Sequence, residues 1–160
     1  MWLRLIALGH KAPAWIDEGC AEYRKRLPRE WQFEERLLKA EKRTDKQTSS
    51  SHIQVTKSRE ADRIEEAWKD STVRIALDER GKLLTSRDLA AYLKDYQAQG
   101  DKVAYVIGGT DGLDARILEQ AHLSISLSRF TLPHDMARVI LMEQLYRAST
   151  LLSGHPYHRD

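Results

Sequence analysis

Apolar and polar positions follow two alternating patterns along the chain. Short apolar runs with the length and composition of strands are separated by longer segments in which apolar residues recur at helical spacing. This alternation predicts an α/β domain with a largely parallel sheet. The expected strands occupy residues 2–8, 32–38, 73–78, 102–107 and 123–127, and the expected helices occupy residues 14–27, 57–69, 86–99, 114–121 and 135–152.

Local signals set further boundaries. Thr85 or Ser86 is expected to cap the helix over residues 86–99, and Gly100 is expected to end it. Residues 39–51 are rich in Lys, Arg, Gln and Ser and contain no apolar residue larger than alanine. Because strand and helix signals resume afterwards without a second core, this segment is interpreted as a basic mobile loop inside one domain of residues 1–160.

Length and charge narrow the function classes. A chain of 160 residues has the size of one domain. The 26 Lys and Arg against 24 Asp and Glu leave a net charge of +2, so bulk charge alone does not indicate nucleic acid. Residues 24–46 hold nine basic against five acidic side chains. That local excess either contacts phosphates or forms an ordinary solvated face.

Cysteine, histidine and hydropathy patterns argue against several other classes. A single cysteine, Cys20, excludes an internal disulfide and a cysteine-based zinc site and favours a reducing compartment. No histidine pair has zinc-ligand spacing with a third ligand nearby, so no metal is expected. No apolar run approaches the length of a membrane span, and the apolar N-terminus has the pattern of a strand rather than a secretory signal. We therefore expect a cytoplasmic protein without membrane contact.

The strongest local motif is the segment 105–113, an apolar strand that leads into a Gly-rich turn and then a helix. Glycine permits positive φ and lets a ligand approach bare backbone amides, and α/β sheets bind ligands at the carboxyl ends of their strands. The spacing matches neither the dinucleotide fingerprint nor the phosphate loop with its lysine. Two further loops, residues 77–86 and 127–134, also follow expected strands. The three loops either converge on a nucleotide-like ligand or are ordinary connections.

The C-terminal part has two further features. Residues 155–160 combine histidine, tyrosine and arginine, which suit stacking on RNA bases and pairing with phosphate, although a disordered terminus is the competing interpretation. The helix over residues 135–152 is apolar on more than one face. Either part of it packs on a second subunit, or the whole helix is buried within the monomer.

Together these motifs resemble the RlmH family of SPOUT methyltransferases over nearly the whole chain. Members of this family methylate N3 of a pseudouridine in large-subunit ribosomal RNA with S-adenosylmethionine. The resemblance is densest in Leu77-Asp-Glu-Arg-Gly-Lys82 followed by Thr85-Ser86, in Val106-Ile-Gly-Gly-Thr-Asp-Gly-Leu113, in residues 123–134, in Glu143-Gln-Leu-Tyr-Arg-Ala148, and in Pro156-Tyr-His-Arg159.

The resemblance implies a fold and a cofactor site. The fold would be a single-domain SPOUT-type parallel sheet with a C-terminal trefoil knot, in a homodimer. S-adenosylmethionine would be bound without metal by the knot loops, and no role is assigned to residues 78–80 or 110–111. The implied cofactor contacts are Leu77, Gly108, Gly109, Leu127, Ser128, Arg129, Phe130, Thr131 and Leu132.

The resemblance also implies an RNA substrate, expected in the assembled ribosome, and a substrate-binding tail at residues 153–160. The target N3 must lose a proton. His134, Tyr157, His158 and Arg159 are the candidate substrate and catalytic residues, with the histidines and the arginine able to accept the proton or stabilise the anion. Water or hydroxide is the other acceptor. The alternative functions are a non-enzymatic ribosome- or RNA-binding protein and a SPOUT methyltransferase that acts on transfer RNA.

Overall fold

The computed structural model describes residues 1–42 and 49–158. Within these ranges, five strands form one sheet in the order β2-β1-β4-β3-β5, and every neighbouring pair is parallel. The strands are β1 (Trp2–Gly9), β2 (Gln32–Lys39), β3 (Val73–Leu83), β4 (Lys102–Ile107) and β5 (Leu123–Ser126). The helices are α1 (Ala14–Arg26), α2 (Ser50–Trp68), α3 (Ser86–Gln99), α4 (Ala115–Gln120) and α5 (His134–Ser153).

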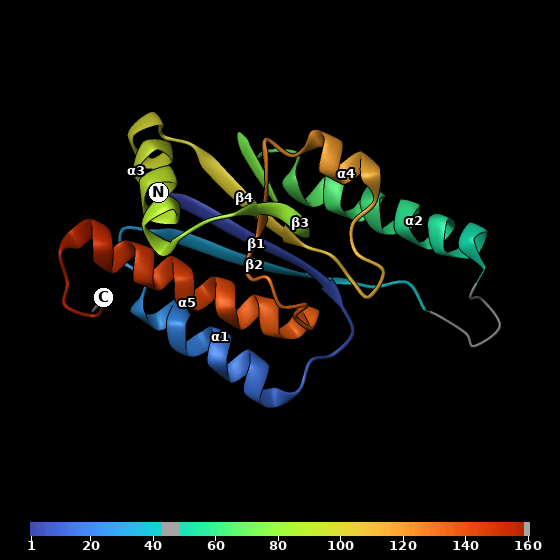
Figure 1. The fold of residues 1–160 in the computed structure, drawn as a ribbon, viewed down its shortest axis with the longest axis horizontal. Helices are drawn as coiled ribbons and strands as arrows, with labels where there is room; N and C mark the ends of the chain where they lie inside the picture. Colours follow the sequence, from blue (N-terminus) through green and yellow to red (C-terminus); the bar gives the residue numbers. More distant parts are fainter. Residues whose placement is uncertain (43–48, 159–160) are drawn as a thin grey trace.

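Helices cover both faces of the sheet (Figure 1). Helices α1, α3 and α5 lie on one face, where α5 packs between the other two, and α2 and α4 lie on the opposite face. Parallel strands require crossover connections, which place helices on the faces of the sheet. Along β1, Leu3 and Leu5 enter the core under α5, whereas Ile6 and Leu8 enter the core under α2. The predicted α/β class with a parallel sheet is confirmed.

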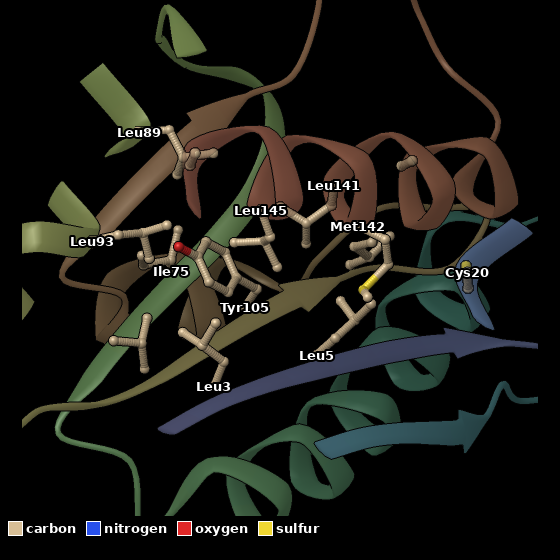
Figure 2. Packing of buried hydrophobic residues seen from close by; sticks show 14 of the residues in the cluster. Leu3, Leu5, Cys20, Ile75, Leu89, Leu93, Tyr105, Leu141, Met142 and Leu145 are labelled. Atoms are coloured by element: carbon tan, nitrogen blue, oxygen red, sulfur yellow. The ribbon is translucent and has the colours of Figure 1, made fainter. Parts of the chain in front are cut away.

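Helix α5 is the centre of the larger core. Leu141 and Leu145 face Leu5 of β1 and Tyr105 of β4 (Figure 2), and both leucines are fully buried. On the same face of the helix, Ala148 is fully buried and Ala137 is 9% exposed, whereas Leu152 near the end of the helix is 37% exposed. Helix α5 therefore has apolar residues on more than one face because it packs between α1 and α3 and on the sheet. Of the two interpretations of that breadth, the structure favours burial within the monomer.

Strand β3 runs five residues further than the sequence pattern predicts. After an irregularity between Leu77 and Lys82, the strand pairs again with β5, and Lys82 lies opposite Ile125. A Cβ atom on Gly81 would lie 2.6 Å from the backbone of Ile125, so only glycine allows the two chains to approach this closely. The charged residues between the two paired parts conceal this extension from a periodicity argument.

The caps of α3 are as predicted. Thr85 accepts a hydrogen bond from the backbone N–H of Asp88, whose carboxylate accepts from the backbone N–H of Thr85, so that both groups are satisfied. Gly100 ends the helix in the left-handed conformation, with φ of 72°.

The predicted mobile loop over residues 39–51 needs correction at both ends. Lys39 still belongs to β2, and α2 begins at Ser50 instead of residue 57. The cause at the second boundary is Ser49, whose side chain accepts a hydrogen bond from the backbone N–H of His52 at 3.4 Å and caps the helix. The first two turns of α2 have only Ile53 and Val55 as apolar residues, and these stand two positions apart, so the segment lacks the apolar repeat by which a helix is recognised. Residues 43–48 of the predicted loop lie outside the described residues.

Candidate active site at the carboxyl edge of the sheet

A cleft of about 570 Å³ lies at the ends of β4 and β5, beside the irregular part of β3 after Leu77. The three strands are parallel, so the ends of β4 and β5 lie at the same edge of the sheet as the part of β3 that follows its pairing with β4. The lining segments are residues 77–80, 107–113, 125–128 and 130–132, together with the beginning of α5. The volume is in the range of small-molecule sites. The three loops that the sequence singles out therefore do converge.

The Gly-rich loop after β4 is a tight turn. The backbone N–H of Gly112 donates to the carbonyl oxygen of Gly109 at 3.0 Å, and Gly112 has a φ of 75°. Gly108 is needed for a different reason, because a Cβ atom there would lie 2.8 Å from the carbonyl carbon of Gly112. The expected positive φ is thus found at Gly112 and not at Gly108 or Gly109.

The cleft combines apolar walls with a charged rim. Its apolar side chains come from all three strand ends, and its charged side chains come mainly from the segment after Leu77. Asp78 accepts from Nε of Arg80 at 3.0 Å, and this hydrogen-bonded pairing lowers the pKa of the Asp78 carboxyl group. The Asp78 side chain is only 12% exposed, whereas that of Arg80 is 75% exposed. An ionised carboxylate is therefore fixed beside the apolar wall.

Most of the residues expected to contact the cofactor line this cleft. They are Leu77, Gly108, Gly109, Leu127, Ser128, Phe130, Thr131 and Leu132. Arg129 is the exception, since it is exposed and is not among the lining residues of the described chain. Ser128 shapes this loop, because its hydroxyl accepts from the backbone N–H of Phe130 at 2.9 Å and its carbonyl accepts from the hydroxyl of Ser126 at 2.8 Å.

Other lining residues are not singled out by the sequence. Residues 78–80 and 110–111, which were assigned no role, line the cleft, and so does Lys57 of α2. No motif marks Lys57, which stands at an ordinary polar position of a helix. It reaches the site because α2 lies over the face of the sheet next to this edge.

The candidate catalytic residues do not meet within one chain. His134 begins α5 and lines the cleft, with its Nε2 atom 3.6 Å from Oδ1 of Asp135. Tyr157 and His158 instead lie along the later turns of α5, and Arg159 lies outside the described residues. Their contact residues, Glu143 and Thr150, follow His134 by roughly 13 to 24 Å along the helix axis.

Tyr157 is held by side chains of α5. Its hydroxyl donates to Oε1 of Glu143 at 3.0 Å, its ring lies 4.6 Å from that of Tyr146, and the Arg147 guanidinium lies 4.9 Å from its ring centre. Partial burial and the Glu143 carboxylate raise the pKa of Tyr157 to about 12. His158 is fixed more weakly, with Nδ1 3.4 Å from the hydroxyl of Thr150.

Residues 1–42 and 49–158 contain no group of three or more His, Cys, Asp and Glu side chains that could hold a metal ion. In the same part of the chain, no helix combines the length and hydropathy needed to cross a membrane. Cys20 is 3% exposed, and burial raises the pKa of its thiol to about 11, so it is poorly suited to react.

Comparison with known proteins identifies the family. The family model described as "Predicted SPOUT methyltransferase" matches residues 1–158. The chain belongs to this SPOUT methyltransferase family. A relative from Ralstonia pickettii (strain 12J) is 48% identical over 159 residues, which is 99% of each chain. A relative from Methylibium petroleiphilum (strain ATCC BAA-1232 / LMG 22953 / PM1) is 44% identical over 160 residues and matches along both full lengths. Both relatives are named ribosomal RNA large subunit methyltransferase H.

Solved structures share the fold of this chain. A probable methylase family protein from Haemophilus influenzae Rd KW20 has a TM-score of 0.63 and 16% identity, covering 99% of this chain and 70% of that chain. A probable methyltransferase from Bordetella pertussis Tohama I has a TM-score of 0.60 and 17% identity, covering 92% of this chain and 95% of that chain. At such identities the likeness concerns the fold alone.

Proposed function

We propose that this SPOUT methyltransferase transfers a methyl group from S-adenosylmethionine to N3 of a pseudouridine in large-subunit ribosomal RNA. The single observation that carries the proposal is the convergence of three strand-end loops, with eight of the nine expected cofactor residues, on one cleft. The names of the full-length relatives support ribosomal RNA as the substrate. These names favour ribosomal RNA over transfer RNA as the substrate, and an enzyme over a non-enzymatic ribosome-binding protein. We propose that the enzyme acts in the cytoplasm.

The residues of the cleft fit S-adenosylmethionine. Apolar side chains such as Leu77, Leu127 and Leu132 suit an adenine ring, and glycines at 108 and 109 leave the peptide groups of their loop without covering side chains. The fixed Asp78 carboxylate suits hydroxyl or ammonium donors. We propose that these residues hold the ligand. We also propose that the loops form the trefoil knot implied by the family.

When bound, S-adenosylmethionine supplies a methyl group that is already activated on a sulfonium. The protein then has to align the target nitrogen with that group and exclude water, which the apolar walls favour. The N3 proton must also leave. His134 is the described candidate acceptor that lines the cleft, with its Nε2 atom 3.6 Å from Oδ1 of Asp135.

We propose a homodimer as the active form. In one chain Tyr157 and His158 lie beside α5 at a distance from the cleft, so a tail that acts on bound RNA would have to belong to a second copy. Phe130, in the cleft loop, is 85% exposed, and Leu83, at the end of β3, is 53% exposed. Such side chains suit a subunit contact. Light scattering should give twice the chain mass of 18.5 kDa at micromolar concentration, and the single-chain mass would contradict the dimer.

The function is tested by methyl transfer from radiolabelled S-adenosylmethionine to assembled ribosomes, free ribosomal RNA and transfer RNA. We expect one methyl group per large subunit, located at N3 of a pseudouridine by mass spectrometry of nuclease fragments, with assembled ribosomes as the best substrate. Ribosomes that lack the pseudouridine serve as the control and should stay unlabelled. Label in transfer RNA, or no label at all, would contradict the proposal.

A further inference from the structure

A second cleft, of about 400 Å³, lies beside the first at the same edge of the sheet. It is lined by the ends of β1 and β2, and β1 pairs directly with β4, whose end lines the first cleft. Gly9 lines the second cleft, and a Cβ atom on it would be 3.5 Å from Nε2 of His134, which lines the first. The beginning of α5 therefore separates two neighbouring clefts.

The second cleft has an apolar surface and a polar rim. Its apolar side chains come from β1 and β2, and one of them, Leu37, is 56% exposed although it is a large aliphatic residue. An exposed leucine in a concave site offers a flat apolar contact for a ring. The polar lining residues are His10, Lys11, Asp17, Lys39, Asp135 and Arg138.

The acidic groups at this cleft already have partners. Asp17 and Glu35 pair with Nη2 of Arg138 at 3.2 and 2.8 Å, and Asp135 faces His134. The Arg138 side chain is only 5% exposed, and its Nε–H has no acceptor among the described residues. A buried N–H donor without an acceptor lowers the stability of the fold unless a water molecule or a ligand accepts its hydrogen bond.

Two cations remain available for a ligand. Lys11 and Lys39 are exposed, and neither forms an ion pair with residues 1–42 or 49–158. Both line the cleft: Lys39 is the last residue of β2, and Lys11 follows the end of β1, the strand that pairs with β2. An apolar surface for a base next to two free ammonium groups for a phosphate has the recognition chemistry of a single-stranded RNA nucleotide.

We propose that the second cleft binds the nucleotide adjacent to the methylated one, with its base against Leu37 and its phosphate at Lys11 and Lys39. This inference rests on the proposed function, because it takes RNA as the substrate and the first cleft as the methyl-donor site. Adjacent clefts suit adjacent nucleotides of one strand. The second cleft thereby fixes which base of the strand enters the first.

The first test compares Lys11→Ala/Lys39→Ala with the control Lys69→Ala/Lys94→Ala, which removes the same charge from exposed positions at the end of α2 and on α3. The measurement is sedimentation binding to purified large ribosomal subunits between 50 and 200 mM salt. For the first pair we expect at least a tenfold loss of affinity and a slope of log affinity against log salt that is smaller by roughly 1.4 to 1.8. Affinity and slope equal to those of the control would overturn the proposal.

The same variants are titrated with S-adenosylhomocysteine, whose affinity should not change. Because the RNA assay measures binding and not methyl transfer, the two proposals can fail separately. Wild-type protein that binds ribosomal subunits but no S-adenosylhomocysteine would contradict the proposed methyl transfer. Wild-type protein that binds both, with an affinity for ribosomal subunits that Lys11→Ala/Lys39→Ala leaves equal to that of the control, would remove the second-cleft proposal alone.

The second test maps what lies over the cleft. Leu37→Cys is labelled with a photoactivatable aryl azide, for which buried Cys20 is a poor competitor, and Lys94→Cys is the control. On ribosomes, we expect the Leu37→Cys protein to cross-link to the nucleotide next to the methylated one, and the control to cross-link elsewhere or not at all. A cross-link into a second copy of this chain would overturn the proposal and assign the cleft to the dimer.

Discussion

The two ends of α5 have very different surroundings. At the first end, His134 and Asp135 line clefts that are built from segments of all five strands and the loops beside them. At the other end, Tyr157 and His158 fold back on side chains of the same helix. The first arrangement is dictated by the topology of the sheet, because parallel strands deliver their carboxyl ends to one edge. The second depends on a few side-chain contacts that a subunit or an RNA could replace.

The difference teaches that the two halves of the expected active site are specified in different ways. On our proposal, the cleft for the methyl donor is formed by the loops of one chain. The proposed substrate-binding tail lies apart from that cleft, so it would need a second copy of the chain to reach it. Changes to the loops that meet the first end should therefore affect cofactor binding, whereas changes at the second end should affect methyl transfer and leave cofactor binding unchanged.

The largest expected effect comes from Gly108→Ala, which attacks the first end. A Cβ atom at this position would meet the backbone of Gly112 at 2.8 Å, so the Gly-rich loop must move. We expect affinity for S-adenosylhomocysteine to fall about 1,000-fold, or roughly 4 kcal/mol, by calorimetry. The control is Gly19→Ala, whose new atom would lie at an ordinary 3.5 Å from Val139. Wild-type affinity in the first variant would show that the loop does not contact the cofactor.

Deleting residues 155–160 tests the second end. These residues contribute nothing to the main cores of the described chain, so folding and S-adenosylhomocysteine affinity should change little. Methyl transfer to ribosomes should fall at least 100-fold in kcat/KM, about 2.7 kcal/mol. If the truncated protein methylates at the parent rate, the tail has no part in the reaction and the comparison between the two ends loses its functional meaning.

His134→Gln probes proton transfer at the first end. We expect kcat to fall about 30-fold, below the roughly 100-fold of a dedicated base, because water can also take the N3 proton. Binding of S-adenosylhomocysteine should stay within about threefold, since the glutamine still fills the wall. An unchanged kcat under single-turnover conditions would exclude His134 as the proton acceptor.

Particular residues show which features of the fold and the site can be predicted from the sequence and which cannot. The sequence predicts the strand positions, the caps of α3, and the loop residues at 108–109 and 127–132. Each of these features has a local signature, namely periodicity, capping chemistry or motif resemblance. Lys57 and the start of α2 are not predicted, because a polar helix turn has no such signature. Nothing in the sequence marks Leu37 and Lys39, which line the second cleft only because β2 pairs with β1.

The smallest expected effect concerns the contact between Tyr157 and Glu143. The pKa of Tyr157 is raised to about 12, so the stability gained from its neutral hydroxyl is fully present below about pH 10 and is lost as the pH rises towards 12. Tyr157→Phe should lower the melting temperature by about one to three degrees at pH 8 and by less at pH 11. A loss of melting temperature that is the same at both pH values would contradict this contact. Glu143→Gln, which changes the other partner of the hydrogen bond, is measured in the same way.

The most direct test of the central claim is calorimetric titration of the wild-type chain with S-adenosylhomocysteine, accompanied by thermal melting. The account predicts measurable heat with one site per chain in solution. It also predicts a melting shift of a few degrees at about 100 times the dissociation constant, where binding adds about 2.7 kcal/mol to stability. No heat and no shift at millimolar ligand would contradict the claim that the three loops form a methyl-donor site.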